Sequence, residues 1–475
     1  MLQLNLAFLA YFLVVNTFYA ALLVSAAVDL WIHVRQVRGE SRWRVLGSDV
    51  APTVSVLSPT YNEAATVVAS VEACLGLQYA NVELIVVNDG STDGTLDVLR
   101  DQFGLEAMHP VFDRRLRTAP VRAIYRSTRD PGLLVIDKDN GGKADALNAG
   151  LDLATGDLVC AVDADTLIEP DALQRMVRPF LLSDDILAAG GTIRVINGCL
   201  IRDGRVVEVH LPRNLIAGLQ VLEYLRAFLI GRLGWNRLGG NLIISGAFGL
   251  FRREAVVAAG GYTNDTVGED VELVVRLRRQ GFEHGGPTRV DFIPDPVAWT
   301  QVPESLRVLG RQRDRWHRGL ADALWRHRRL LFDPRYGALG LVGYPFFLFI
   351  ELFAPILEVL GIAVVLIGLL LGVVDVPLAM LIFLVSYGYG LLLTLSSVLL
   401  EELSYRRYSR LSERLTLVGL ALLEVFGYRQ LTVFWRIRGL VGFLRKRRDW
   451  GVMDRQGFAS PPSRPAPSAG PTGPS

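Results

Sequence analysis

The sequence predicts an α/β domain with a mostly parallel sheet, flanked by transmembrane and interfacial helices. Of its 475 residues, 51% are hydrophobic and 21% are charged. This composition is too apolar for an ordinary soluble enzyme and too charged for a chain that lies wholly in lipid. The uneven distribution resolves the conflict, because residues 1–28 and 376–400 carry no charged side chain, whereas Val50 to Arg335 has the mixed composition of a soluble domain. A domain of that length can bury a substantial core.

The first apolar segment predicts a membrane anchor over residues 1–45. It is long enough to cross a bilayer. Its basic residues follow the apolar run, unlike those of a cleavable signal peptide, which precede it. Cytoplasmic flanks of membrane spans are enriched in arginine and lysine. We therefore expect a retained anchor, with Arg35, Arg38, Arg42 and Arg44 in the cytoplasm and the N-terminus outside.

Two further apolar stretches predict a transmembrane hairpin within residues 337–410. The first covers about 341–374 and the second 376–400. Arginines follow the second stretch, which indicates that the chain returns to the cytoplasm. The first stretch contains Glu351 and Glu358, and ionisable residues within a membrane are usually functional.

The last apolar segment is harder to place, and we expect membrane or interfacial helices over residues 411–458. Its apolar part, Leu415 to Gly427, is short for a span, and a crossing would leave the basic cluster 445–448 outside. A re-entrant or interfacial arrangement avoids this problem. The tail 459–475 is rich in Pro, Ser and Gly, a composition typical of disorder.

Residues 46–302 are expected to form the soluble domain, in which three short apolar runs have the pattern of buried strands. These runs are 53–58, 82–87 and 158–162, and a helical pattern from Glu63 to Leu77 lies between the first two. Strand, helix and strand at this spacing predict parallel pairing with a right-handed crossover. Ligands of such sheets bind at the carboxyl ends of the strands. The residues that follow each strand are therefore candidates for the site.

Polar residues follow each of the three predicted strands. Tyr61 and Glu63 follow the first and Asp89 the second, although helix caps and turns use the same residue types. Asp163 and Asp165 follow the third, and residues two apart on an extended chain face the same side. Two converging carboxylates repel each other unless a cation lies between them. Mg²⁺ or Mn²⁺ held there can bridge the phosphates of a nucleotide diphosphate and neutralise the leaving group.

Two further motifs supply a cation and a carboxylate. Lys143 follows two glycines, which allow close approach of the backbone, and its ammonium can offset phosphate charge. The alternative is a surface lysine at a helix start. Asp270 precedes the helical pattern 271–280. An acid at a helix start is commonly a favourable partner of the helix dipole, but a carboxylate near the anomeric carbon can also accept the proton of an attacking sugar hydroxyl.

An arginine-rich amphipathic helix is expected within residues 303–336. Such a helix can lie on anionic lipid headgroups. That explanation does not account for Gln312, Arg315 and Trp316 together. Tryptophan presents a flat face to a sugar ring, and arginine can hold a diphosphate.

These motifs, in their order along the chain and followed by membrane spans, resemble those of the processive family 2 glycosyltransferases. That group includes the synthases of cellulose, chitin oligomers, hyaluronan and poly-N-acetylglucosamine. The resemblance covers about Val50 to Leu320, and its most specific element is the Gln-x-x-Arg-Trp signature at Gln312, Arg315 and Trp316. It implies a GT-A-like nucleotide-sugar-binding domain, inversion at the anomeric carbon, and passage of the product through the protein's own membrane helices.

The resemblance also implies roles for the motif residues. The residues that the resemblance implies for donor binding are Tyr61, Glu63, Asp89, Lys143, Asp163 and Asp165. Of these, Asp163 and Asp165 would also bind the metal. The general base is Asp270, and the donor diphosphate and the acceptor are held by Gln312, Arg315 and Trp316. Near the C-terminus, Trp450, Gly451 and Arg455 are similar to a donor-gating loop.

The chain departs from the family pattern in two places. Gly268 replaces the threonine of the usual Thr-Glu-Asp, which leaves the base in place but changes its support. The stretch 108–135 looks like an insertion that carries several arginines. The block around Lys143 is more similar to the N-acetylglucosamine-polymer branch than to the cellulose branch.

We therefore predict a multi-pass hexosyltransferase of the plasma membrane with a cytoplasmic catalytic domain, which extends and translocates a β-linked polysaccharide from UDP-N-acetylglucosamine. The expected partners are the UDP-sugar, the growing polysaccharide and the lipid bilayer, with room for a small membrane accessory subunit. The net charge of +2 provides no bulk attraction for nucleic acid. Three alternatives stay open: transfer of one sugar to a membrane lipid, a transporter with Glu351 and Glu358 in an ion pathway, and a binding module whose carboxylates are structural turns.

Overall fold

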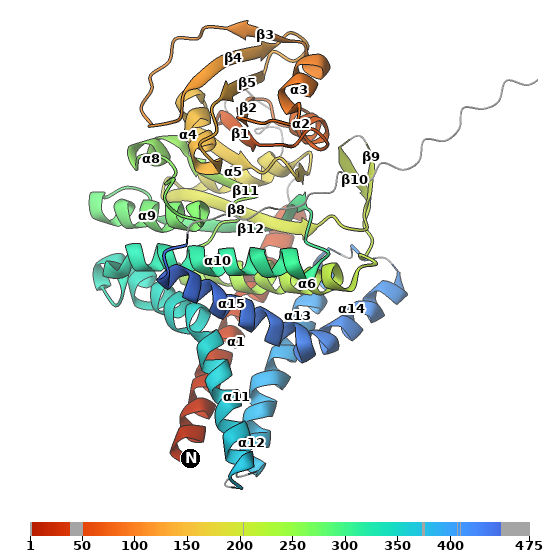
Figure 1. The fold of residues 1–475 in the computed structure, drawn as a ribbon, viewed down its shortest axis with the longest axis vertical. Coiled ribbons are helices and arrows are strands. Elements are labelled where there is room, and N and C mark those ends of the chain that lie inside the picture. The colour runs from red at the N-terminus through yellow and green to blue at the C-terminus, as the bar shows by residue number, and fades with distance from the viewer. Residues whose placement is uncertain are drawn as a thin grey trace, which may run out of the picture.

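A sheet domain stands on a layer of helices, from which a narrow bundle of helices projects (Figure 1). The computed structural model describes residues 2–38, 51–202, 204–372, 376–405, 407, 408 and 410–447. Several predicted features lie outside the described residues: Arg42 and Arg44, the gating loop with Trp450, Gly451 and Arg455, and the tail 459–475.

The described residues form a ten-stranded sheet in the order β3-β4-β5-β2-β1-β6-β11-β8-β12-β7. The strands are β1 (Val54–Thr60), β2 (Val82–Asp89), β3 (Leu105–Met108), β4 (Val121–Ser127), β5 (Leu133–Lys138), β6 (Leu158–Val162), β7 (Thr166–Ile168), β8 (Ile186–Val195), β11 (Phe248–Arg252) and β12 (Arg289–Thr300). Parallel pairing joins β5, β2, β1 and β6 in the centre and β8 with β12. Antiparallel pairs extend the sheet around them. The predicted strands and their parallel pairing are confirmed.

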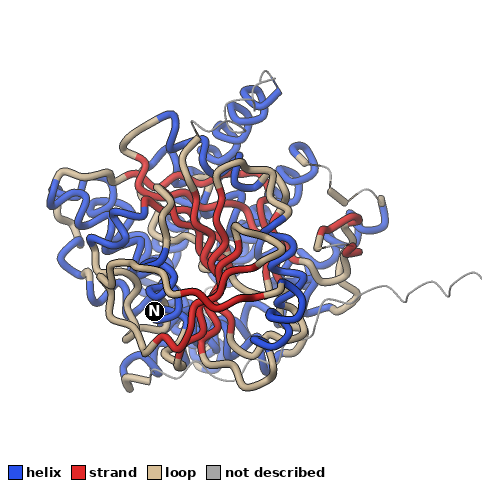
Figure 2. Tube along the Cα trace, turned by 90° about the horizontal axis from the view of Figure 1, so that it is seen from above, coloured by secondary structure: helices blue, strands red, loops and turns tan. Residues whose placement is uncertain are grey.

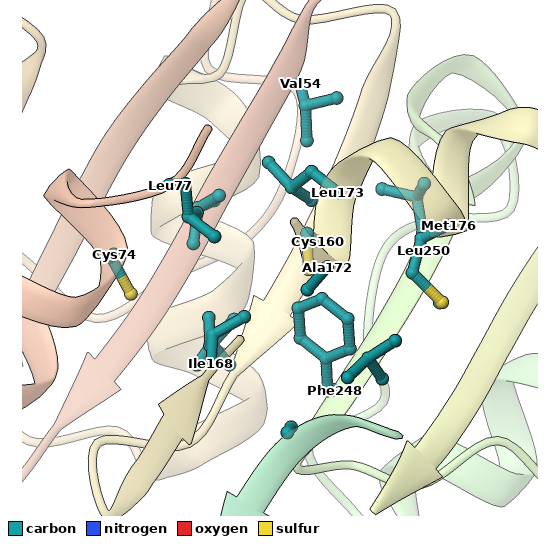
Figure 3. Close-up of a cluster of buried hydrophobic side chains, with 14 of the residues drawn as sticks. Val54, Cys74, Leu77, Cys160, Ile168, Ala172, Leu173, Met176, Phe248 and Leu250 are labelled. Atoms are coloured by element: carbon teal, nitrogen blue, oxygen red, sulfur yellow. The ribbon is translucent and has the colours of Figure 1, made fainter. Parts of the chain in front are cut away.

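Helices cover both faces of this sheet, as Figure 2 shows. One face carries α2 (Val67–Leu75), α3 (Thr95–Phe103) and α5 (Ala172–Leu182), and the other carries α4 (Lys143–Leu153), α8 (Arg253–Ala258) and α9 (Glu269–His284). Side chains of a strand alternate between the two faces. In β6, Cys160 therefore packs in the first core, which Figure 3 shows, whereas Val159 and Ala161 pack in the second.

Two predictions about the domain are wrong. The helix expected from Glu63 begins only at Val67, because Glu63 lies in a turn in which its backbone carbonyl accepts from the N–H of Thr66. The stretch 108–135 is not an insertion: β4 and β5 form part of the sheet, and β5 pairs in parallel with β2. The arginines of β4 hid its strand pattern, because this antiparallel strand lies near the edge of the sheet and is partly exposed.

The projecting bundle contains α1 (Leu2–Arg38), α11 (Ala354–Leu370), α12 (Val376–Phe383) and α13 (Tyr389–Ser404). Within the described residues, three helical segments are long and apolar enough to cross a membrane: Asn5–Arg35, Val376–Ser404 and Leu411–Leu444. A fourth candidate is the pair Leu339–Leu352 and Ala354–Leu370, which is bent by 44°. In Figure 1, α11 and α12–α13 run in opposite directions beside α1, as a hairpin would.

A layer of helices lies between the bundle and the sheet domain. It contains α6 (Leu215–Arg226), α10 (Leu306–Arg326), α14 (Leu411–Leu423), the π-helical turn η7 (Glu424–Tyr428) and α15 (Arg429–Leu444). Backbone angles leave the helical region at Phe426 and Gly427, which kinks the chain between α14 and α15. Figure 1 shows these two helices as a shallow V beneath the domain. By length and composition they also qualify as a span, so their re-entrant or interfacial arrangement stays a prediction.

The predicted arginine-rich helix is α10, but its basic face is not an open lipid-facing surface. It packs along α15 and against α9, and Gln312, Asp314 and Arg318 are among its buried residues. Glycines make the close contact possible, because a Cβ at Gly310 would lie 2.6 Å from the Trp435 ring nitrogen. Much of α10 therefore contacts protein.

Candidate active site

The carboxyl edge of the central strands brings together residues that the sequence separates widely. Asp163 and Asp165 follow β6, Lys143 begins α4, and Glu269 and Asp270 begin α9. Most of these side chains are wholly or partly withdrawn from solvent. A compact group of one ammonium and several carboxylates results.

Lys143 is the cation of this group. Its Nζ lies 2.6 Å from Oδ1 of Asp163 and 3.6 Å from Oε1 of Glu269, and it donates to the carbonyl of Gly246 at 3.3 Å. Gly142 precedes it with φ at +90°, a conformation that favours glycine and directs the chain into the helix. Burial alone would lower the pKa of Lys143, but the carboxylates of Asp163 and Glu269 outweigh burial and raise it. The side chain therefore remains a cation at neutral pH.

Two carboxyl groups of the cluster have strongly raised pKa values. Burial and the charge of Asp163 raise the pKa of Asp165 to about 7, although Lys143 and Arg315 act in the opposite direction. Burial also raises the pKa of Glu269 to about 7, against the effect of Lys143 and with a contribution from Asp270. The cluster thus holds more negative charge than its own cations neutralise, which suits a cationic ligand.

A divalent metal fits this electrostatic imbalance. Among the described residues, no group of three or more His, Cys, Asp or Glu side chains could by itself enclose a metal ion. The carboxylates of Asp163 and Asp165 would supply only part of the coordination, so the oxygens of a bound diphosphate and water would complete it. The residues fit a metal that binds together with a nucleotide.

Asp270 is held in place by two backbone donors. Its Oδ2 accepts from the N–H of Gly246 at 3.0 Å, and its Oδ1 accepts from the N–H of Val271 at 2.8 Å. Glycine at 246 leaves room for this arrangement, because a Cβ there would lie 3.0 Å from Oδ2 of Asp270 and 3.3 Å from Nζ of Lys143, and both side chains would have to shift. The carboxylate therefore has a fixed orientation while keeping acceptor capacity for another proton donor.

Asp89 organises the loop that leads to Lys143. Its carboxylate accepts from Nζ of Lys138 at 2.5 Å and from the N–H groups of Gly141 and Gly142 at 3.0 and 2.8 Å. The same ammonium lies 2.6 Å from Asp145. Asp89 is buried, and these contacts give it a structural task beside the predicted donor contact.

Tyr61 and Glu63 lie on a separate turn after β1. Tyr61 is 49% exposed, so its ring is available for a planar ligand. Glu63 is buried and accepts from the hydroxyl of Thr66 at 2.7 Å. The turn is fixed by Asn62, whose side chain accepts from the N–H of Thr92 at 2.8 Å. Glu63 therefore supports the turn that presents Tyr61.

The helix α10 brings Arg315 to the cluster. Burial lowers the pKa of Arg315, and the carboxylates of Glu269, Asp163 and Asp270 partly offset that effect, which places its guanidinium in their field. Gln312 is buried, and its Oε1 accepts from Arg313 at 3.3 Å. Trp316 is 45% exposed, with the Arg313 guanidinium 4.3 Å from the centre of its ring.

The glycine that replaces the usual threonine has a structural explanation. A Cβ at Gly268 would lie 2.7 Å from the Cα of Gly319 on α10, and a Cβ at Gly319 would lie 2.8 Å from the Cα of Gly268. Two glycines facing each other let the start of α9 touch α10 backbone to backbone. This contact sets the position of Asp270 relative to Arg315.

Several residues of the site were missed by sequence reasoning. Glu269 was visible beside Asp270 but received no role, and Lys138 was missed because β5 was assigned in part to an insertion. Gly246 and Arg313 had no local signal, since their importance arises from tertiary contacts. The assigned residues Lys143, Asp163, Asp165, Asp270 and Arg315 do come together.

This fold and cluster define a glycosyltransferase domain of the nucleotide-sugar-binding type. Residues 55–257 match the model of glycosyl transferase family 2, and residues 158–393 match that of glycosyl transferase family group 2. Together the two matches span residues 55–393, so the chain contains a family 2 glycosyltransferase domain.

The relatives are bacterial polysaccharide synthases. The chain is 28% identical over 319 residues to the poly-beta-1,6-N-acetyl-D-glucosamine synthase of Staphylococcus aureus strain COL. The aligned part covers 66% of this chain and 64% of that protein. It is 28% identical over 276 residues to the synthase of the same name from Staphylococcus epidermidis, covering 58% and 56%. The match thus spans less than two thirds of the length of these curated relatives.

Two solved structures show lower similarity. The mannosyltransferase PcManGT from Pyrobaculum calidifontis, in complex with GDP-Man and Mn²⁺, is 20% identical with a TM-score of 0.47, covering 91% of this chain and 99% of that one. The glucosyl-3-phosphoglycerate synthase of Mycobacterium tuberculosis is 20% identical with a TM-score of 0.35, covering 58% and 80%.

Proposed function

We propose that the protein is a processive, inverting β-glycosyltransferase that extends a polysaccharide from a UDP-sugar, most specifically UDP-N-acetylglucosamine. One observation carries the proposal: the backbone contact between Gly268 and Gly319 joins the helix of the candidate base to the helix with Arg315 and Trp316. We call Trp316, with Gln312 beside it, the acceptor platform. The contact between the two glycines makes the donor site and this platform parts of one rigid arrangement.

On the donor side, the cluster would hold the diphosphate. Lys143 and Arg315 supply positive charge, and Tyr61 presents an exposed ring to the nucleoside. Asp163 and Asp165 would hold Mg²⁺ or Mn²⁺, which stabilises the charge of departing UDP when bound. Asp89 would act mainly through the loop that it shapes.

On the acceptor side, Asp270 would act as the general base. The acceptor hydroxyl oxygen attacks the anomeric carbon, the bond from that carbon to UDP breaks, and the hydroxyl proton passes to Asp270. Attack from the face opposite the leaving group inverts the configuration, so an α-linked donor gives a β linkage. The two backbone donors on Asp270 fix the direction from which it can accept the proton.

Trp316 would hold the end of the growing chain, with Gln312 beside it. A half-exposed tryptophan ring is suited to stack on a sugar. We further propose that the polymer leaves through the membrane helices around α11 to α13, with the catalytic domain on the cytoplasmic side. The identity of the curated relatives supports N-acetylglucosamine as the sugar.

The test is the release of UDP from the purified protein in detergent with Mg²⁺ or Mn²⁺. UDP-N-acetylglucosamine and UDP-glucose are supplied separately, alone and with UDP-glucuronate, and the products are sized on a gel. Long polymer from UDP-N-acetylglucosamine alone is the expected result. A product with one sugar on a lipid would reject processive synthesis, and a requirement for two sugars would reject the proposed donor.

A further inference from the structure

A partly buried ion pair lies next to Trp316, the proposed acceptor-binding residue. The Arg313 guanidinium lies 2.7 Å from Oε2 of Glu223, which belongs to α6. The same carboxylate oxygen accepts from the hydroxyl of Tyr428 at 2.8 Å. Tyr428 ends η7, immediately after the kink at Phe426 and Gly427. Three segments far apart in the sequence therefore meet at one carboxylate.

This group touches the exposed tryptophan of α10. The guanidinium of Arg313 lies over the Trp316 ring at 4.3 Å from its centre. The orientation of the tryptophan ring is thus linked, through Arg313, to Glu223 and Tyr428.

The chemistry of the contact favours positioning over simple packing. Arginine, unlike lysine, can stack its planar guanidinium on an aromatic face while it donates hydrogen bonds at its edge. Arg313 does both, since its edge contacts Glu223 and Gln312. An ion pair with one partner partly exposed contributes little net stability, so stability alone gives little reason for it here.

We infer that Arg313, held by Glu223 and Tyr428, is a positioning residue that sets the plane of Trp316 and thereby the time for which the growing chain stays bound. The inference rests on the proposed function and deepens it. The retention of the chain end, and hence product length, depends on a contact from the kink between α14 and α15. The rate of a single transfer depends on Asp270 and the donor site instead.

Arg313→Lys and Tyr428→Phe test this inference in the full-length protein. The first keeps the charge and loses the planar stack, and the second removes one hydroxyl. We expect Arg313→Lys to raise the KM for a soluble acceptor oligosaccharide by about tenfold and to shorten the product, with kcat within about twofold of wild type. Tyr428→Phe should shift the same two quantities in the same direction by a smaller factor.

A matched control lies just beyond the other end of α10, where Arg328 contacts the ring of Trp325. Arg328 lies 5.2 Å from the ring centre of Trp325, which is 61% exposed, so Arg328→Lys removes an equivalent stack away from the site. It should change neither acceptor KM nor product length. Adding Tyr428→Phe to Arg313→Lys should cause little further loss, because both act through one carboxylate.

The outcomes separate the inference from the proposed function. If the wild type makes polymer but neither single variant changes acceptor KM or product length, the inference is overturned and the proposed function is not. A loss of kcat together with a loss of thermal stability, without a change in product length, would also overturn the inference, because this combination indicates a structural role. If Arg313→Lys does not fold, Tyr428→Phe decides by the same criteria. Absence of polymer from the wild type would instead reject the proposed function.

Discussion

We predict that Gly319→Ala uncouples the two helices of the site. The added Cβ would lie 2.8 Å from the Cα of Gly268 and 3.1 Å from its backbone nitrogen. Ordinary contact begins at 3.4 Å, so the start of α9 must move away from α10 by roughly half an ångström or more. Backbone cannot rotate aside as a side chain can. The movement therefore displaces Asp270 relative to Arg315.

The magnitude follows from two effects. Overpacking of a close contact costs about 1–3 kcal/mol of stability. A displacement of about 1 Å at a catalytic group can lower the rate about a hundredfold, so a shift of half that size should lower kcat by roughly tenfold. UDP release at saturating donor and acceptor measures kcat, and thermal unfolding in detergent measures stability.

Gly419→Ala is the matched control. Gly419 lies within α14, and an added Cβ there meets nothing within 4 Å. In a helix, alanine is favoured over glycine by about 1 kcal/mol, so this variant should be active and at least as stable as wild type. If Gly319→Ala also keeps kcat within about twofold of wild type, the backbone contact does not position the base, and the reasoning is refuted.

Three further predictions concern the cluster itself. Asp270→Asn should lower kcat by about a hundredfold or more while donor affinity, from titration of UDP-sugar binding, stays close to wild type; near-normal turnover would reject the base assignment. Asp165→Asn should remove the stimulation of UDP binding by Mn²⁺, as isothermal titration with and without chelator can show; an unchanged response would place the metal elsewhere. Without metal and donor, the thermal stability of the wild type should fall from about pH 5 to about pH 7 and level off above that. The folded pKa of Glu269, about 7, exceeds the unfolded value of 4.5, so the native state holds its proton longer. Asp165, whose pKa is also raised to about 7, contributes to the same slope. Glu269→Gln should therefore reduce the slope without removing it, and an equal slope in both proteins would exclude Glu269 as a source.

The central strands were predictable because their residues are apolar and end in polar motifs. The runs that became β1, β2 and β6 are buried on both faces, so they are continuous rather than alternating in the sequence. The antiparallel strand β4 was not predictable in the same way. Its partly exposed residues include arginines, and its place in the sheet depends on a partner distant from any motif.

The site was predictable where chemistry is local in the sequence and not where it is tertiary. Asp163 and Asp165 lie two residues apart after a strand, so their convergence follows from strand geometry. The pairing of Gly268 with Gly319 joins positions separated by a helix and a long strand, and no pattern in either segment signals it. Gly268, which replaces the threonine of the usual Thr-Glu-Asp, is one half of this close contact between backbones.

The membrane segments show how two unexplained features can account for each other. Glu351 and Glu358 were acids within an apolar stretch, and arginines interrupted the last apolar segment. In the structure, Arg429 lies 3.0 Å from Glu358 and Arg436 lies 3.3 Å from Glu351. Charges buried in apolar surroundings are usually paired, so each set explains the presence of the other. This pairing weakens the alternative of an ion pathway, because the glutamates already have fixed partners on α15. It also connects α15, which packs along α10, to the first helices that follow the sheet domain.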